Sequence, residues 1–266
     1  MNLNLNIPIL MYHQISESPH PNFLGYTVTP KAFESQMKAL KMLGFRTITF
    51  DQLMAHREGK GKLPRRPIIV TFDDGLTESI EHSVPVLEKL GFTAVYYMPT
   101  NYMGIKSGWM VPEIDAEFQI VDWPTVRDLD SHGFEIGSHT MNHPWLNRIP
   151  PEQCHQELEG SRKRLEDFLG HEVRHIAYPF GAHNEQVKTI ASETGYYTAC
   201  TTEPFIAGTD SNMFSLPRLN IGMQESLLDF LLRVHTTKIT PHDFRAKIPG
   251  PLRRFVKNYL LGGKTN

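Results

Sequence analysis

The stretch PIIVTFDDGLTESIEHSVPVLEKLG, residues 67–91, reads as one complete unit of a strand followed by a helix. Its apolar start, Ile68–Phe72, is typical of a buried strand, and an acidic pair with a glycine follows directly. Apolar residues then recur at helical spacing as far as Leu90. Gly91 marks the end of the helix, because glycine adopts the left-handed cap conformation without strain.

The same order of elements recurs along the chain. Seven other apolar runs are predicted strands, and most precede an amphipathic segment: Ile7–Met11, Thr47–Phe50, Ala94–Met98, Phe134–Ser138, His175–Tyr178, Thr198–Thr201 and Ser215–Leu219. This alternation predicts parallel strands joined by helices, and up to eight strands favour a (β/α) barrel over an open sheet. Residues 101–122 are the least periodic, and we expect them to form a long loop near the barrel mouth.

Composition limits the class of protein. The chain has 266 residues, of which 40% are hydrophobic and 21% charged, as expected for a globular protein with one large core. Its 27 Lys and Arg against 29 Asp and Glu give a net charge of −2, which argues against a nucleic-acid partner. Two cysteines, Cys154 and Cys200, are too few for a disulfide framework or a cysteine-rich zinc module.

The charge is unevenly distributed between two parts of the chain. Residues 245–266 hold six basic and no acidic residues, which leaves 21 basic against 29 acidic residues, a net −8, in residues 1–244. We therefore expect a barrel domain over 1–244 and a basic tail over 245–266. The tail has an amphipathic helical pattern, compatible with peripheral contact to an anionic membrane or with docking on the barrel.

The two ends of the chain also give an expected location. The first residues lack the basic region of a signal peptide, and no stretch approaches the roughly 20 apolar residues of a membrane-spanning helix. We therefore expect a cytoplasmic protein, placed at the inner face of the membrane if the tail binds lipid.

Two segments at expected strand ends carry the residues most suited to chemistry. Asp73 and Asp74 are adjacent carboxylates, whose mutual repulsion is costly unless a cation or a proton compensates it. An acidic pair before glycine is also ordinary turn chemistry. His139 and His143 are four residues apart, so one helical turn or a tight loop brings both imidazoles to one side. Two histidines and one carboxylate form a common ligand set for a catalytic divalent metal.

The chain resembles the polysaccharide deacetylase superfamily, also called the NodB-homology or carbohydrate esterase family 4 domain. TFDDG at 71–75, SHTMNHP at 138–144 and YPFG at 178–181 are similar to its three ordered motifs. The resemblance extends over about residues 7–235. It is closest to a bacterial exopolysaccharide deacetylase branch with an N-terminal Tyr-His motif, present here as Tyr12-His13.

The resemblance implies a fold, a reaction and a set of roles. The fold would be a single-domain, distorted (β/α)7 barrel, and the usual reaction removes N-acetyl, sometimes O-acetyl, groups from sugars. Asp73 would be the general base. The backbone N–H of Phe180 would stabilise the oxyanion, with Tyr178 and Pro179 beside it. The implied metal ligands are Asp74, His139 and His143.

The general acid is the main departure from the commonest pattern of the family. That pattern ends in a Leu-x-His segment, and the closest match here is Val234-His235. This match lies in an amphipathic helix, so we interpret His235 as a helix-surface residue. We expect His13 to act as the acid, because it ends the first strand on the catalytic face, although orienting a neighbouring loop is an alternative role.

Two other family positions also differ. Where the family often has an Arg two residues before the Pro of the third motif, this chain has Ala177. Arg218, at another strand end, either replaces that Arg as the partner of the base or forms a surface salt bridge. The Asp-x-x-Asp-Trp segment expected after the third motif is missing. Three residues offer an apolar wall for a sugar ring, with core packing an equal alternative for the last: Trp109, Met110 and Trp123.

Together these features predict a metal-dependent carbohydrate N-deacetylase acting on a polysaccharide or glycan precursor. Zinc is the expected metal, and cobalt, nickel, manganese and iron suit the same ligands. A hydrolase of a non-sugar amide, such as a cyclic imide or ureide, and a non-catalytic glycan-binding barrel are the alternatives. The remaining histidines are expected to be structural or solvated: His20, His56, His82, His132, His155, His171, His175, His183 and His242.

Overall fold

A curled parallel β-sheet forms the centre of the protein in the computed structural model, which describes residues 5–223 and 225–235. Its strands are β2 (Ile9–Tyr12), β5 (Arg46–Thr47), β6 (Pro67–Phe72), β7 (Val95–Met98), β8 (Glu135–Ser138), β9 (His175–Ala177), β10 (Thr198–Cys200) and β12 (Leu219–Asn220). Seven of them follow one another in the order β10-β9-β8-β7-β6-β2-β12, and β5 pairs with the first residues of β6. All of these pairings are parallel.

The two ends of this sheet approach each other. The backbone N–H of Thr201, just after β10, donates to the carbonyl of Leu216 at 2.9 Å, and the N–H of Leu216 donates to Ala199 at 2.9 Å. Leu216 belongs to the segment that leads into β12, so this segment links β10 back towards the other edge of the sheet. The expected single-domain (β/α) barrel is therefore confirmed, with seven strands along its circumference.

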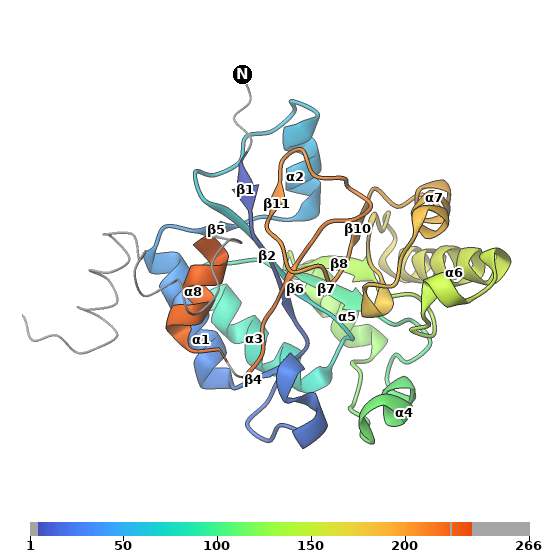
Figure 1. Cartoon of the computed structure of the whole chain (residues 1–266), viewed down its shortest axis with the longest axis horizontal. Helices are drawn as coiled ribbons and strands as arrows, with labels where there is room; N and C mark the ends of the chain where they lie inside the picture. The colour runs from blue at the N-terminus through green and yellow to red at the C-terminus, as the bar shows by residue number, and fades with distance from the viewer. Residues whose placement is uncertain (1–4, 224, 236–266) are drawn as a thin grey trace, which may run out of the picture.

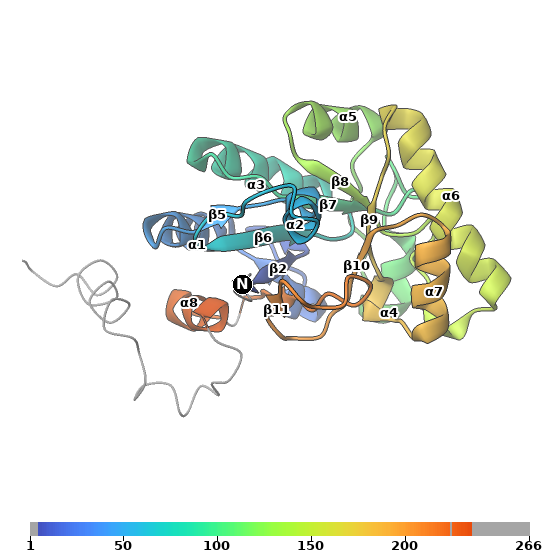
Figure 2. The same ribbon diagram turned by 90° about the horizontal axis from the view of Figure 1, so that it is seen from above.

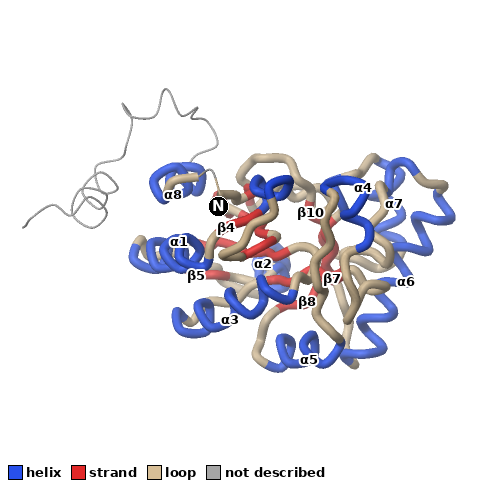
Figure 3. The backbone as a smooth tube through the Cα atoms, turned by 90° about the horizontal axis from the view of Figure 1, so that it is seen from below, coloured by secondary structure: helices blue, strands red, loops and turns tan. Residues whose placement is uncertain are grey.

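Helices surround the sheet, as Figures 1, 2 and 3 show. They are α1 (Pro30–Met42), α2 (Phe50–Arg57), α3 (Thr77–Leu90), α4 (Val111–Ile114), α5 (Trp123–Ser131), α6 (Pro151–Leu169), α7 (Glu185–Glu193) and α8 (Leu227–His235). Short 3₁₀ turns are η1 (Pro21–Tyr26), η2 (Gly108–Met110), η3 (Leu146–Arg148) and η4 (Pro179–Gly181). Two small pairs complete the fold: antiparallel β1 (Asn6–Ile7) with β11 (Ala207–Gly208), and parallel β3 (Gln14–Ile15) with β4 (Thr27–Val28).

Alternate strand residues fill two separate cores, as the pleat of a strand requires. In β6, Val70 and Phe72 face the large core that the outer helices cover, whereas Ile69 belongs to the core inside the barrel. The barrel interior also holds Val95 and Ala177 from neighbouring strands. This packed interior leaves the two ends of the barrel as the places for polar sites.

Three expected elements differ from the structure. The predicted strand Ser215–Leu219 overlaps the observed strand only at Leu219, because β12 is Leu219–Asn220. The predicted strand Thr47–Phe50 is wrong, because β5 ends at Thr47 and α2 begins at Phe50. Thr49 and Gln52 form a capping box there, which satisfies the first free N–H groups of the helix. Residues 101–122 form a long connection as expected, but it contains η2 and α4.

The parallel strands give the barrel two distinct ends. In Figure 1, β4 and α4 lie at the lower end, towards which the strands point, and α2, β1 and β11 lie at the upper end. Within the described residues, no helix is both long and apolar enough to cross a bilayer. The basic tail 245–266 and His242 lie outside the described residues, so their expected roles stay predictions.

Candidate active site

A cavity of ≈ 530 Å³ opens at the carboxyl ends of the strands. This is the end at which a (β/α) barrel carries its functional loops. The cavity brings together eight of the residues that the sequence singled out: His13, Asp73, Asp74, Trp109, Met110, His139, His143 and Phe180. They come from five separate stretches of the chain, so the fold, and not local sequence, assembles them.

The expected metal ligands converge in this cavity. The Oδ1 atom of Asp74 lies 3.4 Å from Nε2 of His139 and 3.3 Å from Nε2 of His143. All three side chains are buried. Asp74 and His143 have left-handed backbone angles, with φ of 71° and 58°, although neither is glycine. Such strain persists only where surrounding structure enforces it, and it is typical of functional sites.

The chemistry of these donors fits a divalent metal. Oδ1 of Asp74 is buried and has no hydrogen-bond partner, yet it faces two imidazole nitrogens. Nδ1 of His139 lies 2.7 Å from the carbonyl of Ala177, which can only accept, so Nδ1 carries a proton and, in the neutral ring, Nε2 is the atom that offers a lone pair to a metal. Burial alone would raise the pKa of Asp74, but His139 and His143 outweigh it and hold that pKa well below its usual range.

Asp73 is held by Arg218 in a two-point ion pair. The guanidinium donates to both carboxylate oxygens at 2.6 Å. It also donates to the Thr71 hydroxyl at 3.1 Å and to the Thr201 carbonyl at 3.0 Å. Arg218 is fully buried, so the alternative of a surface salt bridge is wrong. Burial alone would raise the pKa of Asp73, but Arg218 outweighs it and keeps this carboxylate ionised.

Sequence reasoning missed the carboxylate that holds the loop between the two histidines. Glu157, on α6, is buried, and its Oε2 accepts the backbone N–H groups of Met141 and Asn142, both at 2.9 Å. Its Oε1 accepts from the Asn142 side chain at 2.6 Å. These bonds fix a loop in which Thr140 and His143 both have positive φ. The only sequence signal was an acidic residue on the apolar face of a predicted helix.

Aromatic side chains form the walls of the cavity. Trp109 stacks on the ring of His143, with centroids 4.9 Å apart. Trp145 and Phe180 stack almost in parallel, 4.2 Å apart. The sequence identified Trp109 and Phe180 but missed Trp145, which follows the second motif directly. Flat apolar surfaces of this kind suit the faces of sugar rings.

Met110 and Trp123, which the sequence suggested as parts of one apolar wall, lie in different places in the structure. Met110 lines the cavity. The ring of Trp123 instead packs on Phe168 of α6, 4.9 Å away, and does not line the cavity. The open alternative for Trp123 is therefore resolved in favour of core packing.

The two candidate acids lie at opposite ends of the barrel. His13 lines the cavity, and its ring contacts Tyr26 at a centroid distance of 4.8 Å. His235 ends α8, where its ring packs on Phe45, just before β5, and its Nδ1 lies 2.7 Å from the Leu231 carbonyl. His235 is half-buried and not a plain surface residue. Its position gives it no access to the cavity.

Only part of the third motif lines the cavity. Phe180 lines the cavity and has a φ of 58°, which turns the backbone sharply within η4. The ring of Tyr178 lies in the core between α6 and α7, and its hydroxyl donates to the Phe214 carbonyl at 3.2 Å. Neither Tyr178 nor the buried Pro179 lines the cavity. The Tyr178 side chain therefore packs in the core, and the oxyanion or substrate role that the resemblance implies for Tyr178 and Pro179 stays a prediction.

His175, one of the remaining histidines that were expected to be structural or solvated, has two convergent acidic partners that the sequence did not reveal. Its ring is buried at the amino-terminal end of β9, where Asp51 and Glu135 face it. The sequence could not show this, because the three residues come from α2, β8 and β9. This cluster lies at the end of the barrel opposite the cavity.

Sequence comparison relates the chain to known proteins. The sequence profile of the family described as polysaccharide deacetylase matches residues 60–199. The chain is 32% identical to the Bacillus subtilis protein YxkH over 216 residues, which cover 81% of this chain and 71% of that protein. It is 24% identical to a Staphylococcus aureus poly-beta-1,6-N-acetyl-D-glucosamine N-deacetylase over 207 residues, covering 74% and 69% of the two chains.

A solved structure agrees with these sequence matches. The crystal structure of a polysaccharide deacetylase from Bacillus cereus superposes with a TM-score of 0.74 at 27% identity, covering 88% of this chain and 70% of that one. Because the profile spans more than half of the chain and a relative above 30% identity aligns over most of both lengths, the chain belongs to the polysaccharide deacetylase family.

Proposed function

We propose that this protein is a metal-dependent hydrolase that removes N-acetyl groups from the amino sugars of a polysaccharide or glycan precursor. The observation that carries the proposal is the meeting, in one cavity, of three candidate metal ligands, an ionised carboxylate and a histidine. Asp74, His139 and His143 supply the triad, Asp73 the carboxylate and His13 the histidine.

The metal would be held by the three triad side chains. When bound there, a divalent ion such as zinc supplies Lewis acidity, which acidifies water and polarises an acetyl carbonyl. Cobalt, nickel, manganese and iron accept the same donors. His139 is oriented for this role by Ala177, and the loop that carries His143 is held by Glu157.

Asp73 would act as the general base. Its carboxylate is ionised and fixed by Arg218, and the lone pairs that Arg218 leaves free accept the proton of the attacking water. The water oxygen then bonds to the acetyl carbon, and the carbonyl oxygen gains negative charge. The backbone N–H of Phe180 is the proposed donor to that oxygen.

His13 would complete the reaction as the general acid. It lines the same cavity as Phe180, and it gives a proton to the sugar nitrogen as the C–N bond breaks. The products are acetate and a free amine. The aromatic walls of Trp109, Trp145 and Phe180 support a sugar substrate, as does the activity named for the Staphylococcus aureus relative.

Acetate release tests this proposal. The purified chain, with zinc, is assayed on N-acetylglucosamine oligomers, on an acetylated xylan fragment and, by ring opening, on a cyclic imide. Acetate from the amino-sugar oligomers, abolished by a chelator, is expected. Turnover of the imide alone would replace the proposal with the amide hydrolase, and oligomer binding without any turnover would replace it with the glycan-binding barrel.

A matched pair of histidine variants tests the assignment of the acid. His13→Ala should lower the rate at least ~100-fold, within the usual contribution of acid–base catalysis. His235→Ala is the control and should retain the wild-type rate, because its ring lies at the other end of the barrel. The reverse ranking of the two variants would overturn the role of His13.

A further inference from the structure

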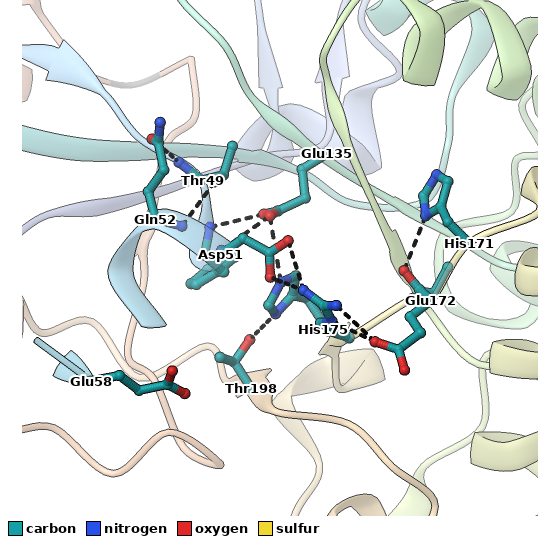
Figure 4. Close-up of polar contacts among 12 residues, drawn as sticks. Thr49, Asp51, Gln52, Glu58, Glu135, His171, Glu172, His175 and Thr198 are labelled. Carbon is teal, nitrogen blue, oxygen red and sulfur yellow. Dashed lines mark hydrogen bonds and ion pairs between the residues drawn. The ribbon is translucent and has the colours of Figure 1, made fainter. Parts of the chain in front are cut away.

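We propose that Asp51, Glu135 and His175 bind a second divalent cation at the amino-terminal end of the barrel. The three residues come from the first turn of α2 and from the first residues of β8 and β9. Figure 4 shows the two carboxylates and the imidazole pointing toward one another. The proposed ion has a structural role, and the proposal does not depend on the deacetylase reaction.

The spacing of the donors matches the candidate catalytic triad. Nε2 of His175 lies 3.2 Å from Oδ1 of Asp51 and 3.4 Å from Oε1 of Glu135. The corresponding distances around Asp74 are 3.4 and 3.3 Å. Tetrahedral zinc with nitrogen and oxygen ligands at about 2.0–2.2 Å separates its ligand atoms by roughly 3.3–3.6 Å. Two donor separations in each cluster are therefore close to those of a three-ligand metal site, and all three donors of each lie within 4.8 Å of one another.

Neighbouring groups fix the donors, as outer hydrogen bonds do at metal sites. Nδ1 of His175 lies 2.9 Å from the hydroxyl of Thr198 in β10, which leaves Nε2 facing the carboxylates. The backbone N–H of Phe50 donates to Oε2 of Glu135 at 2.9 Å, and the N–H of Asp51 donates to Oε1 at 3.2 Å. His175 is only 2% exposed, so its ring has no freedom to turn away.

The surroundings favour a cation and give it access. The cluster lines a cavity of ≈ 240 Å³, into which Asp130 and Glu172 add two further acidic side chains. The side chain of Asp51 is 51% exposed, so an ion reaches the site from solvent and keeps coordination positions for water. Two groups oppose this charge: Arg174 lies 3.3 Å from both Asp51 oxygens and 2.7 Å from Glu172, and His171 lies 2.9 Å from Asp130. Each carboxylate oxygen still has lone pairs for a second partner.

A proton is the rival occupant of the same space. Burial lowers the pKa of His175, but the charges of Glu135 and Asp51 outweigh it and raise the pKa to about 9. A protonated His175 alone would tie α2 to the sheet through these two carboxylates. The donor geometry suits either occupant, so direct measurement of bound metal separates them.

Zinc stoichiometry measured by equilibrium dialysis and elemental analysis tests the proposal with the full chain. Asp74→Asn removes the candidate catalytic site, so any zinc that remains bound belongs elsewhere. Wild type should bind two equivalents and Asp74→Asn one. His175→Gln in the wild-type background should also bind one, and the Asp74→Asn/His175→Gln double variant should bind none.

Half-exposed Asp51 provides a variant that leaves the buried ring in place. In the Asp74→Asn background, Asp51→Asn should lose the remaining equivalent and the zinc-induced rise in melting temperature. Glu58→Gln, at the C-cap of the same helix but paired with Lys60, is the matched control and should retain both. Absence of zinc from Asp74→Asn, or a second equivalent that survives Asp51→Asn and His175→Gln, would overturn the proposal in favour of the proton.

Discussion

The ion pair between Arg218 and Asp73 gives the strongest quantitative prediction. Arg218→Met removes four hydrogen bonds, two of which join opposite charges at 2.6 Å, and leaves the Asp73 carboxylate buried without a cation. Charge-assisted bonds contribute about 1.5–3 kcal/mol each, so the two bonds to Asp73 represent about 3–6 kcal/mol. Breaking a buried pair by removing one partner typically costs ~3–5 kcal/mol, in the same range.

The expected loss in unfolding free energy for Arg218→Met is therefore ~3–5 kcal/mol, or about 6–20 °C in Tm for a chain of this size. Asp73→Asn keeps the side-chain volume and one acceptor oxygen, so it should cost less. The double variant leaves no unpaired charge and should be more stable than the sum of the two single effects predicts, by at least ~2 kcal/mol.

Urea unfolding followed by tryptophan fluorescence measures these differences. Lys106→Met is the control, because Lys106 and Glu117 form an exposed pair, and its effect should stay within about 0.5 kcal/mol. Additive effects of Arg218→Met and Asp73→Asn would refute the reasoning, since they would mean that the two side chains do not depend on each other.

Three other substitutions test the surroundings of the cavity. Glu157→Gln should weaken zinc binding at the catalytic triad ~10–100-fold, because the loop between its histidines loses a charged acceptor; unchanged affinity would contradict the positioning role. Trp109→Ala should raise KM for oligomers ~10-fold, equivalent to about 1.4 kcal/mol, and an unchanged KM would exclude the ring as a sugar platform. Tyr178→Phe should cost about 1 kcal/mol in unfolding free energy through the lost bond to Phe214 and leave steady-state rates unchanged; a large fall in kcat would return Tyr178 to the site.

The sequence predicts most of the barrel because local signals agree there. Apolar runs with helical segments between them identify β6, β7, β8 and the helices that follow, and glycine marks helix ends such as Gly91, with φ of 60°. The strand prediction around Phe50 was wrong because a short alternating apolar run suits a strand or a helix start equally well. Thr49 and Gln52 carried the deciding signal, since their spacing is that of a capping box.

The candidate site was predictable where one segment carries several of its residues. Two such pairs are adjacent or close in the sequence, and their residue types and spacing predict a metal site: Asp73 with Asp74, and His139 with His143. The partner that holds the loop between the histidines comes from a distant element, since Glu157 lies on α6, and the stacking of Trp145 on Phe180 likewise joins two separate motifs. No local pattern encodes such contacts, because they arise only when the loops meet at the end of the barrel. The cluster around His175 was not predicted for the same reason, since its three residues come from three separate elements.

The central claim is that Asp73 activates water in a metal site for attack on an N-acetyl group. Its most direct test is the rate of acetate release from an N-acetylglucosamine oligomer by zinc-loaded wild type and zinc-loaded Asp73→Asn at equal metal content. We expect wild type to release acetate at least ~100-fold faster, the lower bound for loss of a general base. Equal rates in the two proteins, with zinc bound to both, would contradict the account.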